Sequence, residues 1–389
     1  MRIIGLMSGT SVDSIDAALV EIQGQGYDLT VQVLASTYLD YPEALRAQIL
    51  KVCGGEVLSL TALADLDDQI AQQFAIAAKT LINTHGPVAL VASHGQTVFH
   101  RPRPATKSSA ALAYSVQLGR GAVIAELTQC PTVNNFRAAD IAAGGEGAPL
   151  VPPVDLALLS HDYHYRCIQN IGGIGNVTAL PPRSAAKDIQ AHASKMLLGW
   201  DTGPGNSLID IAVHHFSKGE LTFDRDGQWS AQGDICPPLL AQWLTHPYFQ
   251  QAPPKSTGRE TFGWDFFQQC LVQTSPYDLR PADILATLTE LTVCSIAQSY
   301  ERFLPRLPDE VLVCGGGSRN HYLMGRLQQQ WPQIPVQTTD TAGVPSDLKE
   351  AIAFAVLGFW HHQGWPGNLP SVTGAQRTVV LGEIAWPQS

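Results

Sequence analysis

The feature that most constrains the fold of this chain is a strand–glycine turn–strand pattern that occurs twice. The first copy covers residues 2–22, where an apolar run leads into a turn rich in Gly, Ser and Thr and continues as a second, alternating stretch. The second copy covers residues 167–180 and begins about 165 residues further along the chain. A pattern that restarts in this way predicts a duplicated unit with a cleft between the two halves.

The remaining segments alternate helices with strands. Helical spacing is found over residues 42–53, 60–85, 283–304 and 347–362, and short apolar strands are expected at 88–92, 310–314 and 378–382. Alternation of this kind is typical of the α/β class.

Composition and charge exclude several classes of protein. Hydrophobic residues make up 45% of the 389 residues and charged residues 15%, which excludes a disordered chain. The net charge of −10 and the lack of a dense Lys/Arg cluster argue against a nucleic-acid partner. No apolar run approaches the roughly 18–20 residues of a membrane span, and residues 1–7 lack the flanks of a signal peptide. The seven cysteines form no CxxC pair, so we expect a cytoplasmic protein without disulfides or zinc.

The first turn, Gly9–Asp16, is a candidate phosphate-binding loop. Its small and hydroxyl-bearing residues allow backbone N–H groups and side-chain hydroxyls to converge on phosphate oxygens. Asp13 and Asp16 could hold Mg²⁺, directly or through water, because Mg²⁺ prefers oxygen ligands. The alternative is an ordinary hairpin turn with polar caps, since the segment does not match the GxxxxGK[ST] phosphate loop.

Asp201, within the segment Gly199–Asn206, is the candidate general base. We expect it where a strand ends and a helix begins, at the edge of the sheet where ligands of open α/β folds bind. A carboxylate at that place can accept a proton. The alternative is that Asp201 caps the following helix. The surrounding glycines and proline favour the functional interpretation, because they let a ligand approach the backbone closely.

A run of three glycines, Gly315–Gly317, follows a strand and is a second candidate for nucleotide contact. Glycines allow the close backbone approach that a base or ribose needs, and a nearby helix N-terminus favours phosphate. A plain tight turn explains the run equally well.

Residues 93–97, which include Gln96 and Thr97, are expected to form a polar loop after a short strand. His94 and His100 raise the possibility of a metal site, but the three or four correctly spaced ligands that zinc needs are missing from this segment. We therefore favour a sugar-binding loop, with His94 as a hydrogen-bonded residue.

Two charged residues complete the candidates. Arg137 lies in a mostly apolar stretch and could bind a carboxylate bidentately, or form a structural ion pair with Asp140 or another acid. Glu350 lies on a predicted helix and, taken alone, is interpreted as a solvated surface residue.

Taken together, these segments resemble the anhydro-N-acetylmuramic acid kinases, members of the sugar kinase–actin–heat-shock ATPase superfamily. The matching segments span nearly the whole chain in order: MSGTSVDSIDAAL (7–19), SHGQTVFH (93–100), NFRAADIAAGGEGAPLVP (135–152), NIGGIGNVT (170–178), GWDTGPGNSLID (199–210), PKSTGRETF (254–262), VCGGGSRN (313–320) and NLPSVTGAQRTVVLG (368–382). The resemblance implies a duplicated actin-like (ribonuclease H-like) ATPase fold. Its first domain would comprise residues 1–150 plus about 345–389 and its second residues 151–344, and the two domains would flank a central cleft.

The resemblance also implies roles for individual residues. The ATP phosphates would be held by Gly9, Thr10, Ser11, Val12, Asp13, Ser14, Ile15 and Asp16, and the rest of the nucleotide by Gly315, Gly316 and Gly317. Asp201 would be the proton acceptor, and Gln96, Thr97, Arg137 and Glu350 would contact the sugar. Three positions depart from the family pattern: Ser14 stands where Gly is usual, Glu146 where Gln is usual, and Gly175 where Ala is usual.

The implied activity is ATP- and Mg²⁺-dependent opening and phosphorylation of 1,6-anhydro-N-acetylmuramic acid to N-acetylmuramic acid 6-phosphate, in cell-wall recycling. The six-position oxygen of such a sugar is tied into a bridge, so a water must attack the anomeric carbon while that oxygen leaves toward the γ-phosphate. The resemblance also implies a homodimer. The alternatives are a kinase that acts on a free hydroxyl of another amino sugar, and a non-catalytic actin-like ATPase module.

Overall fold

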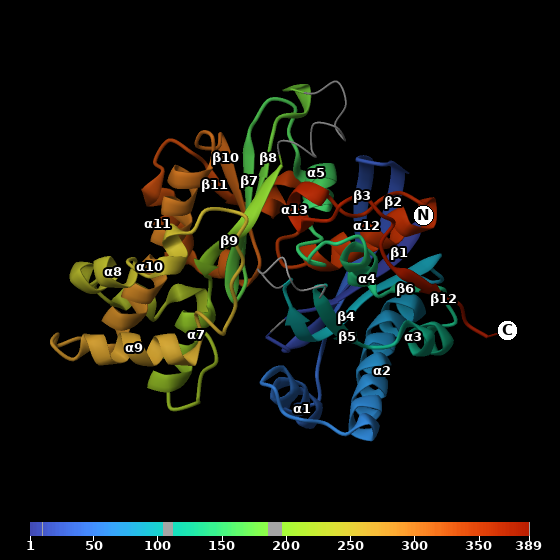
Figure 1. Ribbon diagram of the computed structural model, residues 1–389, viewed down its shortest axis with the longest axis horizontal. Coiled ribbons are helices and arrows are strands. Elements are labelled where there is room, and N and C mark those ends of the chain that lie inside the picture. Colours follow the sequence, from blue (N-terminus) through green and yellow to red (C-terminus); the bar gives the residue numbers. More distant parts are fainter. Residues whose placement is uncertain (10, 104–111, 186–196, 389) are drawn as a thin grey trace. The chain divides into compact units, whose positions relative to one another are not determined.

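The computed structural model describes residues 1–9, 11–103, 112–185 and 197–388, which fall into two compact units (Figure 1). Unit 1 contains the described residues of Met1–Leu158 and Leu348–Ser389. Unit 2 contains the described residues of Leu159–Asp188 and Met196–Asp347. Each unit has its own sheet and its own hydrophobic core.

The sheet of unit 1 has the strand order β12-β6-β4-β1-β2-β3, with β5 paired to β4. Its strands are β1 (Arg2–Ser8), β2 (Ser14–Gln25), β3 (Asp28–Asp40), β4 (Leu90–Arg101), β5 (Tyr114–Leu118), β6 (Thr132–Asn134) and β12 (Glu383–Ala385). β1, β2 and β3 form an antiparallel meander, and β4 and β6 continue the sheet in parallel with β1.

Helices pack on both faces of this sheet. The helices of this unit are α1 (Glu43–Cys53), α2 (Leu60–His85), α3 (Gly121–Thr128), α4 (Phe136–Ala142), α5 (Pro152–Leu159), α12 (Lys349–Gln363) and α13 (Pro370–Thr373), and α2 and α12 cover the sheet. Alternation along β1 separates the two faces. Leu6 packs in a core with Phe74 of α2, whereas a Cβ on Gly5 would meet the backbone of Ala351 in α12. Glycine at position 5 therefore allows α12 to lie directly on the strand.

The sheet of unit 2 has the order β11-β10-β7-β8-β9. Its strands are β7 (Arg166–Ile171), β8 (Ile174–Leu180), β9 (Leu198–Pro204), β10 (Glu310–Cys314) and β11 (Val336–Thr338). Here too the first three strands form an antiparallel meander and the next two run parallel to the first. The same order and directions occur in unit 1, so the duplication predicted from the two glycine turns is confirmed.

The helices of unit 2 enclose one core, with α10 at its centre. They are α7 (Ser207–Phe216), α8 (Pro237–Trp243), α9 (Trp264–Thr274), α10 (Pro281–Phe303) and α11 (His321–Gln330). Nearly the whole of α10 is buried, and Tyr300 stacks on Trp331 with ring centroids 5.1 Å apart. The helices expected at 42–53, 60–85 and 283–304 are confirmed.

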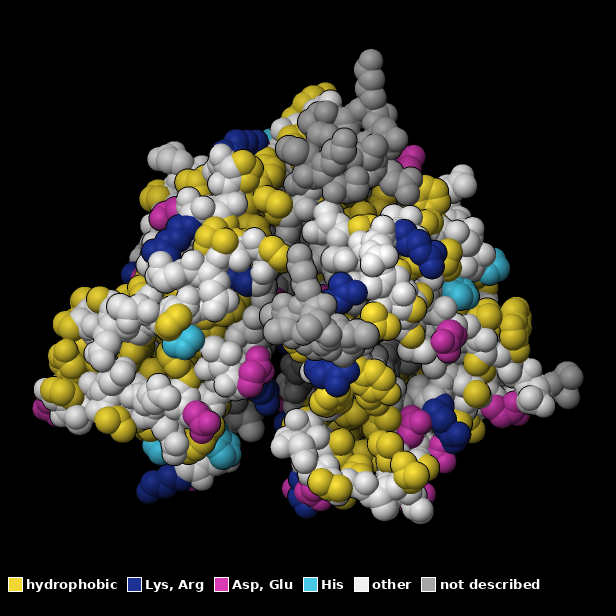
Figure 2. Space-filling view, in the orientation of Figure 1, with side chains coloured by type: hydrophobic (Ala, Val, Ile, Leu, Met, Phe, Trp, Pro, Cys, Tyr) yellow, Lys and Arg dark blue, Asp and Glu magenta, His cyan; other side chains and the backbone are white. Residues whose placement is uncertain are grey.

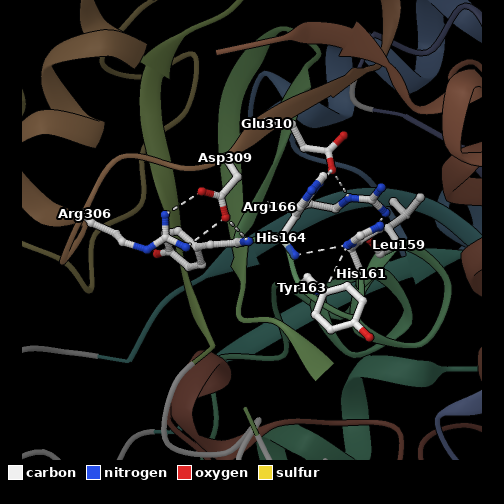
Figure 3. Close-up of polar contacts among 9 residues, drawn as sticks. Leu159, His161, Tyr163, His164, Arg166, Arg306, Asp309 and Glu310 are labelled. Atoms are coloured by element: carbon white, nitrogen blue, oxygen red, sulfur yellow. Dashed lines mark hydrogen bonds and ion pairs between the residues drawn. The ribbon is translucent and has the colours of Figure 1, made fainter. Parts of the chain in front are cut away.

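Charged pairs fix the register of β7 against β10, close to the point where the chain enters unit 2 (Figure 3). Arg166 and Glu310 are register partners, and their side chains are 2.7 Å apart and only 14% and 15% exposed. Arg166 also donates to the carbonyl oxygen of Leu159 (2.8 Å), and His164 Nδ1 lies 2.8 Å from Glu310. A shift of one residue would separate Glu310 from both Arg166 and His164, so these side chains specify the pairing.

Three predicted elements are placed differently in the structure. β4 continues through Arg101, so residues 93–97 are strand and not loop. Asp201 lies inside β9 and not at its end. The final strand predicted at 378–382 is also wrong, because the residues that pair with β6 are Glu383–Ala385.

Two surface properties bear on function. Among the described residues, no helix has both the length and the hydropathy required to cross a bilayer. On the face drawn in Figure 2, Lys and Arg side chains lie scattered among acidic and polar ones.

Candidate active site

The β1–β2 turn of unit 1 is held in place by side chains from other elements. Ser8 Oγ lies 2.7 Å from Oε1 of Gln96 and 3.0 Å from the carbonyl oxygen of Ser14. Arg46 of α1 donates from Nε to the carbonyl oxygen of Val12 at 2.9 Å. These side-chain donors bind carbonyl oxygens of the turn. The backbone N–H groups of the turn are then the groups that can bind an anion. Thr10, also expected here, lies outside the described residues.

Val12 is the strained residue of this turn. Its φ is +56°, a region that a β-branched residue rarely adopts, and its side chain is fully buried in the core. Burial of the side chain supplies the stabilisation that offsets the backbone strain. Ser14, the departure noted above, opens β2 without a positive φ and donates to Asp16 Oδ1 at 3.0 Å.

The two candidate metal-binding carboxylates differ in their surroundings. Asp13 forms an ion pair with Arg46 at 2.7 Å, and its side chain is 64% exposed. Asp16 lies on β2, partly buried, and accepts the hydrogen bond from Ser14. An arginine partner competes with a metal for the carboxylate oxygens, so the Arg46 pair argues against Asp13 as a Mg²⁺ ligand. Among the described residues, no group of three or more His, Cys, Asp or Glu side chains is placed to hold a metal.

Gln96 and Thr97 lie next to each other on β4 but have different surroundings. The side chain of Gln96 is fully buried; its Nε2 donates to the carbonyl oxygen of Gly9 (3.3 Å), and its Oε1 accepts from Tyr41 (3.3 Å). The hydrogen bond from Gln96 to Gly9 therefore stabilises the β1–β2 turn. Thr97 is only partly buried, and its hydroxyl accepts from Gln117 Nε2 of β5 at 3.1 Å.

Arg137, on α4, is partly buried and lies against His94 of β4. Its guanidinium approaches His94 Nε2 at 2.9 and 3.3 Å and donates to the carbonyl oxygen of Gly147 at 2.8 Å. Because an arginine can only donate, His94 accepts at Nε2 and is neutral. Burial, reinforced by the charge of Arg137, holds the pKa of His94 well below its usual value. Burial also lowers the pKa of Arg137 to about 10, while Glu350 and Asp140 oppose that change.

Among the described residues, Arg137 and Asp140 do not form the suggested ion pair. The Asp140 carboxylate is fully buried and accepts from the Gly147 backbone N–H (2.8 Å), Asn368 Nδ2 (2.7 Å) and Thr373 Oγ1 (2.7 Å). Asp140 thus joins the glycine-rich segment after α4 to two residues near the C-terminus.

Glu350, in the first turn of α12, is partly buried, so its interpretation as a solvated residue is wrong. Burial raises the pKa of its carboxyl; Lys349 and Arg137 oppose this, and Asp155 adds to it. Lys349 and Asp155 form a buried ion pair of 2.6 Å. Glu350, Arg137 and the neutral His94 therefore belong to one cluster of ionisable side chains within unit 1.

In unit 2, Asp201 is held by the segment 255–257. Its Oδ2 accepts from the backbone N–H of Thr257 (2.9 Å), and its own N–H donates to the carbonyl oxygen of Lys255 (3.2 Å). Tyr248 donates its hydroxyl to the Asp201 carbonyl oxygen at 2.7 Å. Asp201 does not cap α7, because the residue at that helix cap is Asn206.

The environment of Asp201 makes its carboxylate more basic. Burial raises its pKa to about 6; the Thr257 hydrogen bond lowers the pKa, Glu260 raises it and Lys255 lowers it. A carboxylate with that pKa is ionised near neutral pH and remains a competent proton acceptor. In the described part of the chain, the buried hydroxyl of Thr257 has no hydrogen-bond partner, so a donor beside Asp201 is left unused.

The three glycines after β10 differ in what surrounds them. Gly315 has a φ of +79°, and a Cβ on Gly317 would collide with the side chain of Ile171. A Cβ on Gly316 would meet only Asn206 Nδ2, at 3.7 Å. Gly315 and Gly317 are therefore explained by the fold itself, whereas Gly316 faces open space. Gly175, another departure, lies where a Cβ would be 2.7 Å from Thr202 Oγ1.

Sequence reasoning missed several residues that build these sites. Arg46 and Tyr41 support the first turn, and Tyr248, Lys255 and Thr257 surround Asp201. Only Lys255 and Thr257 had a signal, because they lie in the segment PKSTGRETF (254–262), which matches the family. Arg46 and Tyr41 act through long-range contacts that no local pattern reveals.

The comparisons with known proteins agree over nearly the full length. The family model described as "Anhydro-N-acetylmuramic acid kinase" matches residues 1–387. A protein of that name from Acaryochloris marina is 57% identical over 385 residues, covering 99% of each chain. Another of that name from Cyanothece sp. (strain PCC 7425) is 55% identical over 384 residues, again covering 99% of each chain.

Solved structures are more distant. An activator of 2-hydroxyisocaproyl-CoA dehydratase from Clostridium difficile aligns with a TM-score of 0.46 and 11% identity, over 93% of this chain and 96% of that one. On the family model and the full-length relatives, the chain belongs to the anhydro-N-acetylmuramic acid kinase family.

Proposed function

We propose that this kinase opens 1,6-anhydro-N-acetylmuramic acid with water and transfers a phosphoryl group from ATP to the six-position oxygen. The family match over residues 1–387 supports the activity. The observation that carries the mechanism is the state of Asp201, a partly buried carboxylate whose pKa is raised to about 6.

In this mechanism Asp201 removes a proton from the attacking water. The Thr257 N–H at Oδ2 and the backbone bond to Lys255 fix the carboxylate, so it can be presented in a single orientation. The water oxygen bonds to the anomeric carbon, and the bond from that carbon to the bridging oxygen breaks. The freed oxygen bonds to the γ-phosphorus as the bond from that phosphorus to the oxygen it shares with the β-phosphate breaks, and ADP leaves with that electron pair. The proton remains on Asp201 until ADP and the product leave.

The proposed nucleotide contacts are the β1–β2 turn, Gly9–Asp16, and the glycine run Gly315–Gly317. The first offers backbone N–H groups in a turn held by Ser8, Gln96 and Arg46. Bound Mg²⁺ would neutralise charge on the phosphates, and Asp16 is the residue proposed to hold it. Within unit 1, Thr97, Arg137 and Glu350 are the proposed sugar contacts. A cytoplasmic location and a homodimer remain predictions.

The test is ADP release from Mg²⁺–ATP, with and without 1,6-anhydro-N-acetylmuramic acid, in water enriched in heavy oxygen. We expect sugar-dependent ADP and a 6-phosphosugar with the label on its anomeric hydroxyl. ADP at an equal rate without sugar would instead indicate an ATPase module. Phosphorylation only of a free-hydroxyl sugar would indicate the other kinase.

The assignment of the base has its own variant. Asp201→Asn keeps the shape of the side chain but cannot accept the proton, so turnover should fall by at least about 10²-fold while ATP binding is retained. Near wild-type turnover would exclude Asp201 as the base.

A further inference from the structure

Lys255 lies beside Asp201 in an unusual setting for a lysine. Its Nζ is 4.6 Å from the ring centre of Tyr248 and 4.9 Å from that of Phe303, and it donates to the Tyr248 carbonyl oxygen at 3.3 Å. No ion pair of the described residues includes Lys255. Cation–π contacts thus hold the ammonium group without neutralising it.

Charged groups on the elements that pack around Lys255 and Asp201 act on the ionisation of both side chains. Arg302 of α10 repels the Lys255 ammonium, and Asp201 of β9 attracts it. Glu260, from the same loop as Lys255, acts against ionisation of Asp201. Burial and Arg302 lower the pKa of Lys255 to about 8, so it is charged at neutral pH and below.

The backbone links the two residues directly. The carbonyl oxygen of Lys255 accepts the N–H of Asp201, and the N–H of Thr257 reaches the Asp201 carboxylate. Tyr248 contacts both residues, through its hydroxyl to Asp201 and through its ring and carbonyl oxygen to Lys255. The lysine charge is therefore held in a fixed place with respect to the proposed base.

We propose that Lys255 is a positioning residue whose fixed positive charge keeps Asp201 deprotonated between substrate binding and proton transfer. This role rests on the proposed function of Asp201 as the base. It predicts an electrostatic effect on one step, since Lys255 itself neither gives nor takes a proton.

The kcat–pH profile of Lys255→Met tests the proposal. An opposite charge nearby lowers a carboxyl pKa, and its loss should move the acidic limb of kcat up by about half to one pH unit. Turnover near pH 6 should then fall about two- to fivefold, because about half of Asp201 is ionised there in the wild type and about a quarter to a tenth in the variant. Above pH 8, where Lys255 loses its own charge, the variant and the wild type should converge. Lys255→Arg keeps the charge and should restore the limb.

Lys79→Met, an exposed lysine on α2, is the matched control and should leave the profile unchanged. The carboxyl resonance of Asp201, identified by its loss in Asp201→Asn, gives the pKa directly by ¹³C NMR in folded Lys255→Met protein. If that pKa and the acidic limb do not move, the proposal is overturned. A raised KM for the sugar with an unmoved limb also overturns it, in favour of substrate binding by Lys255.

A failure of the proposed function would give a different result from a failure of the role proposed for Lys255. If Asp201→Asn stays active, the base is not Asp201 and the mechanism falls before Lys255 is considered. If Asp201→Asn is inactive and the limb of Lys255→Met does not move, the mechanism stands and only the role of Lys255 fails.

Discussion

At the scale of single residues, Asp201 shows that a candidate catalytic group can oppose folding. Its pKa is about 6 in the folded chain and 3.8 in an exposed carboxyl. The pKa of Asp201 is higher in the folded chain than in the unfolded one. The stability that protonated Asp201 contributes is therefore fully present below pH 3.8, and it is lost as the pH rises through 6. The difference of roughly two pH units limits the cost of the ionised form at pH 8 to about 3 kcal/mol.

Asp201→Asn should therefore raise the free energy of unfolding at pH 8, by about 1–3 kcal/mol, and change it little at pH 4. Urea denaturation at the two pH values measures this. Asp65→Asn, an exposed position on α2, is the control and should show no such pH dependence. A variant no more stable than the wild type at pH 8 would contradict the burial argument.

For Asp140 we expect the opposite effect, a loss of stability on substitution, because its buried carboxylate accepts three hydrogen bonds. In Asp140→Asn the new NH₂ group would face donors, namely the Asn368 amide, the Thr373 hydroxyl or the Gly147 N–H. We expect a loss of about 2–4 kcal/mol in the free energy of unfolding, since a buried charged acceptor loses its partners. Urea denaturation beside Asp65→Asn is the measurement, and a loss below about 0.5 kcal/mol, the usual range for surface substitutions, would exclude this role.

At the scale of elements, local sequence was sufficient for the long helices and insufficient for the strands that carry the site. The periodicity of residues 60–85 fixes α2, because a helix is specified by neighbours three and four residues apart. β4 was predicted to stop at Ala92, but it continues because Gln96–Arg101 pair with β5, a partner more than ten residues away. Asp201 was placed at the end of β9 for the same reason: pairing with β8, which extends the strand, is not visible in the local sequence.

The glycine run after β10 gives a prediction that separates fold from function. Gly317→Ala should lower the melting temperature by several degrees, because the new methyl collides with Ile171 and overpacking costs about 1–3 kcal/mol. Gly316→Ala has room for its methyl, so its melting temperature should match the wild type. If Gly316 faces the nucleotide, the same methyl should weaken ATP binding about tenfold, which is about 1.4 kcal/mol. Unchanged ATP affinity in calorimetry would remove Gly316 from the nucleotide site.

At the scale of the whole molecule, the repeated glycine turn allowed the duplication to be predicted, and the match of distant segments allowed the family to be predicted. What neither could provide was the set of contacts between segments far apart in the chain. The Asp140 bonds to Asn368 and Thr373 join residues more than 220 positions apart. Such contacts depend on the completed fold, which explains why Asp140 was considered only as a partner for Arg137.

The same long-range organisation predicts how the two units depend on the C-terminal segment. Every residue from Ala351 to Trp360 of α12 is buried, and the helix lies on β1 at Gly5. Its six large apolar side chains, at about 2 kcal/mol each, contribute as much as the whole stability of a typical domain, about 5–15 kcal/mol. A chain that ends at Asp347 should therefore lose hydrogen-exchange protection in β1, β2 and β4, while β7, β8 and β10 keep theirs. A chain that ends at Ala385 retains α12 and should keep protection in both sheets. Protection of β1 in the shorter chain would show that unit 1 folds without α12.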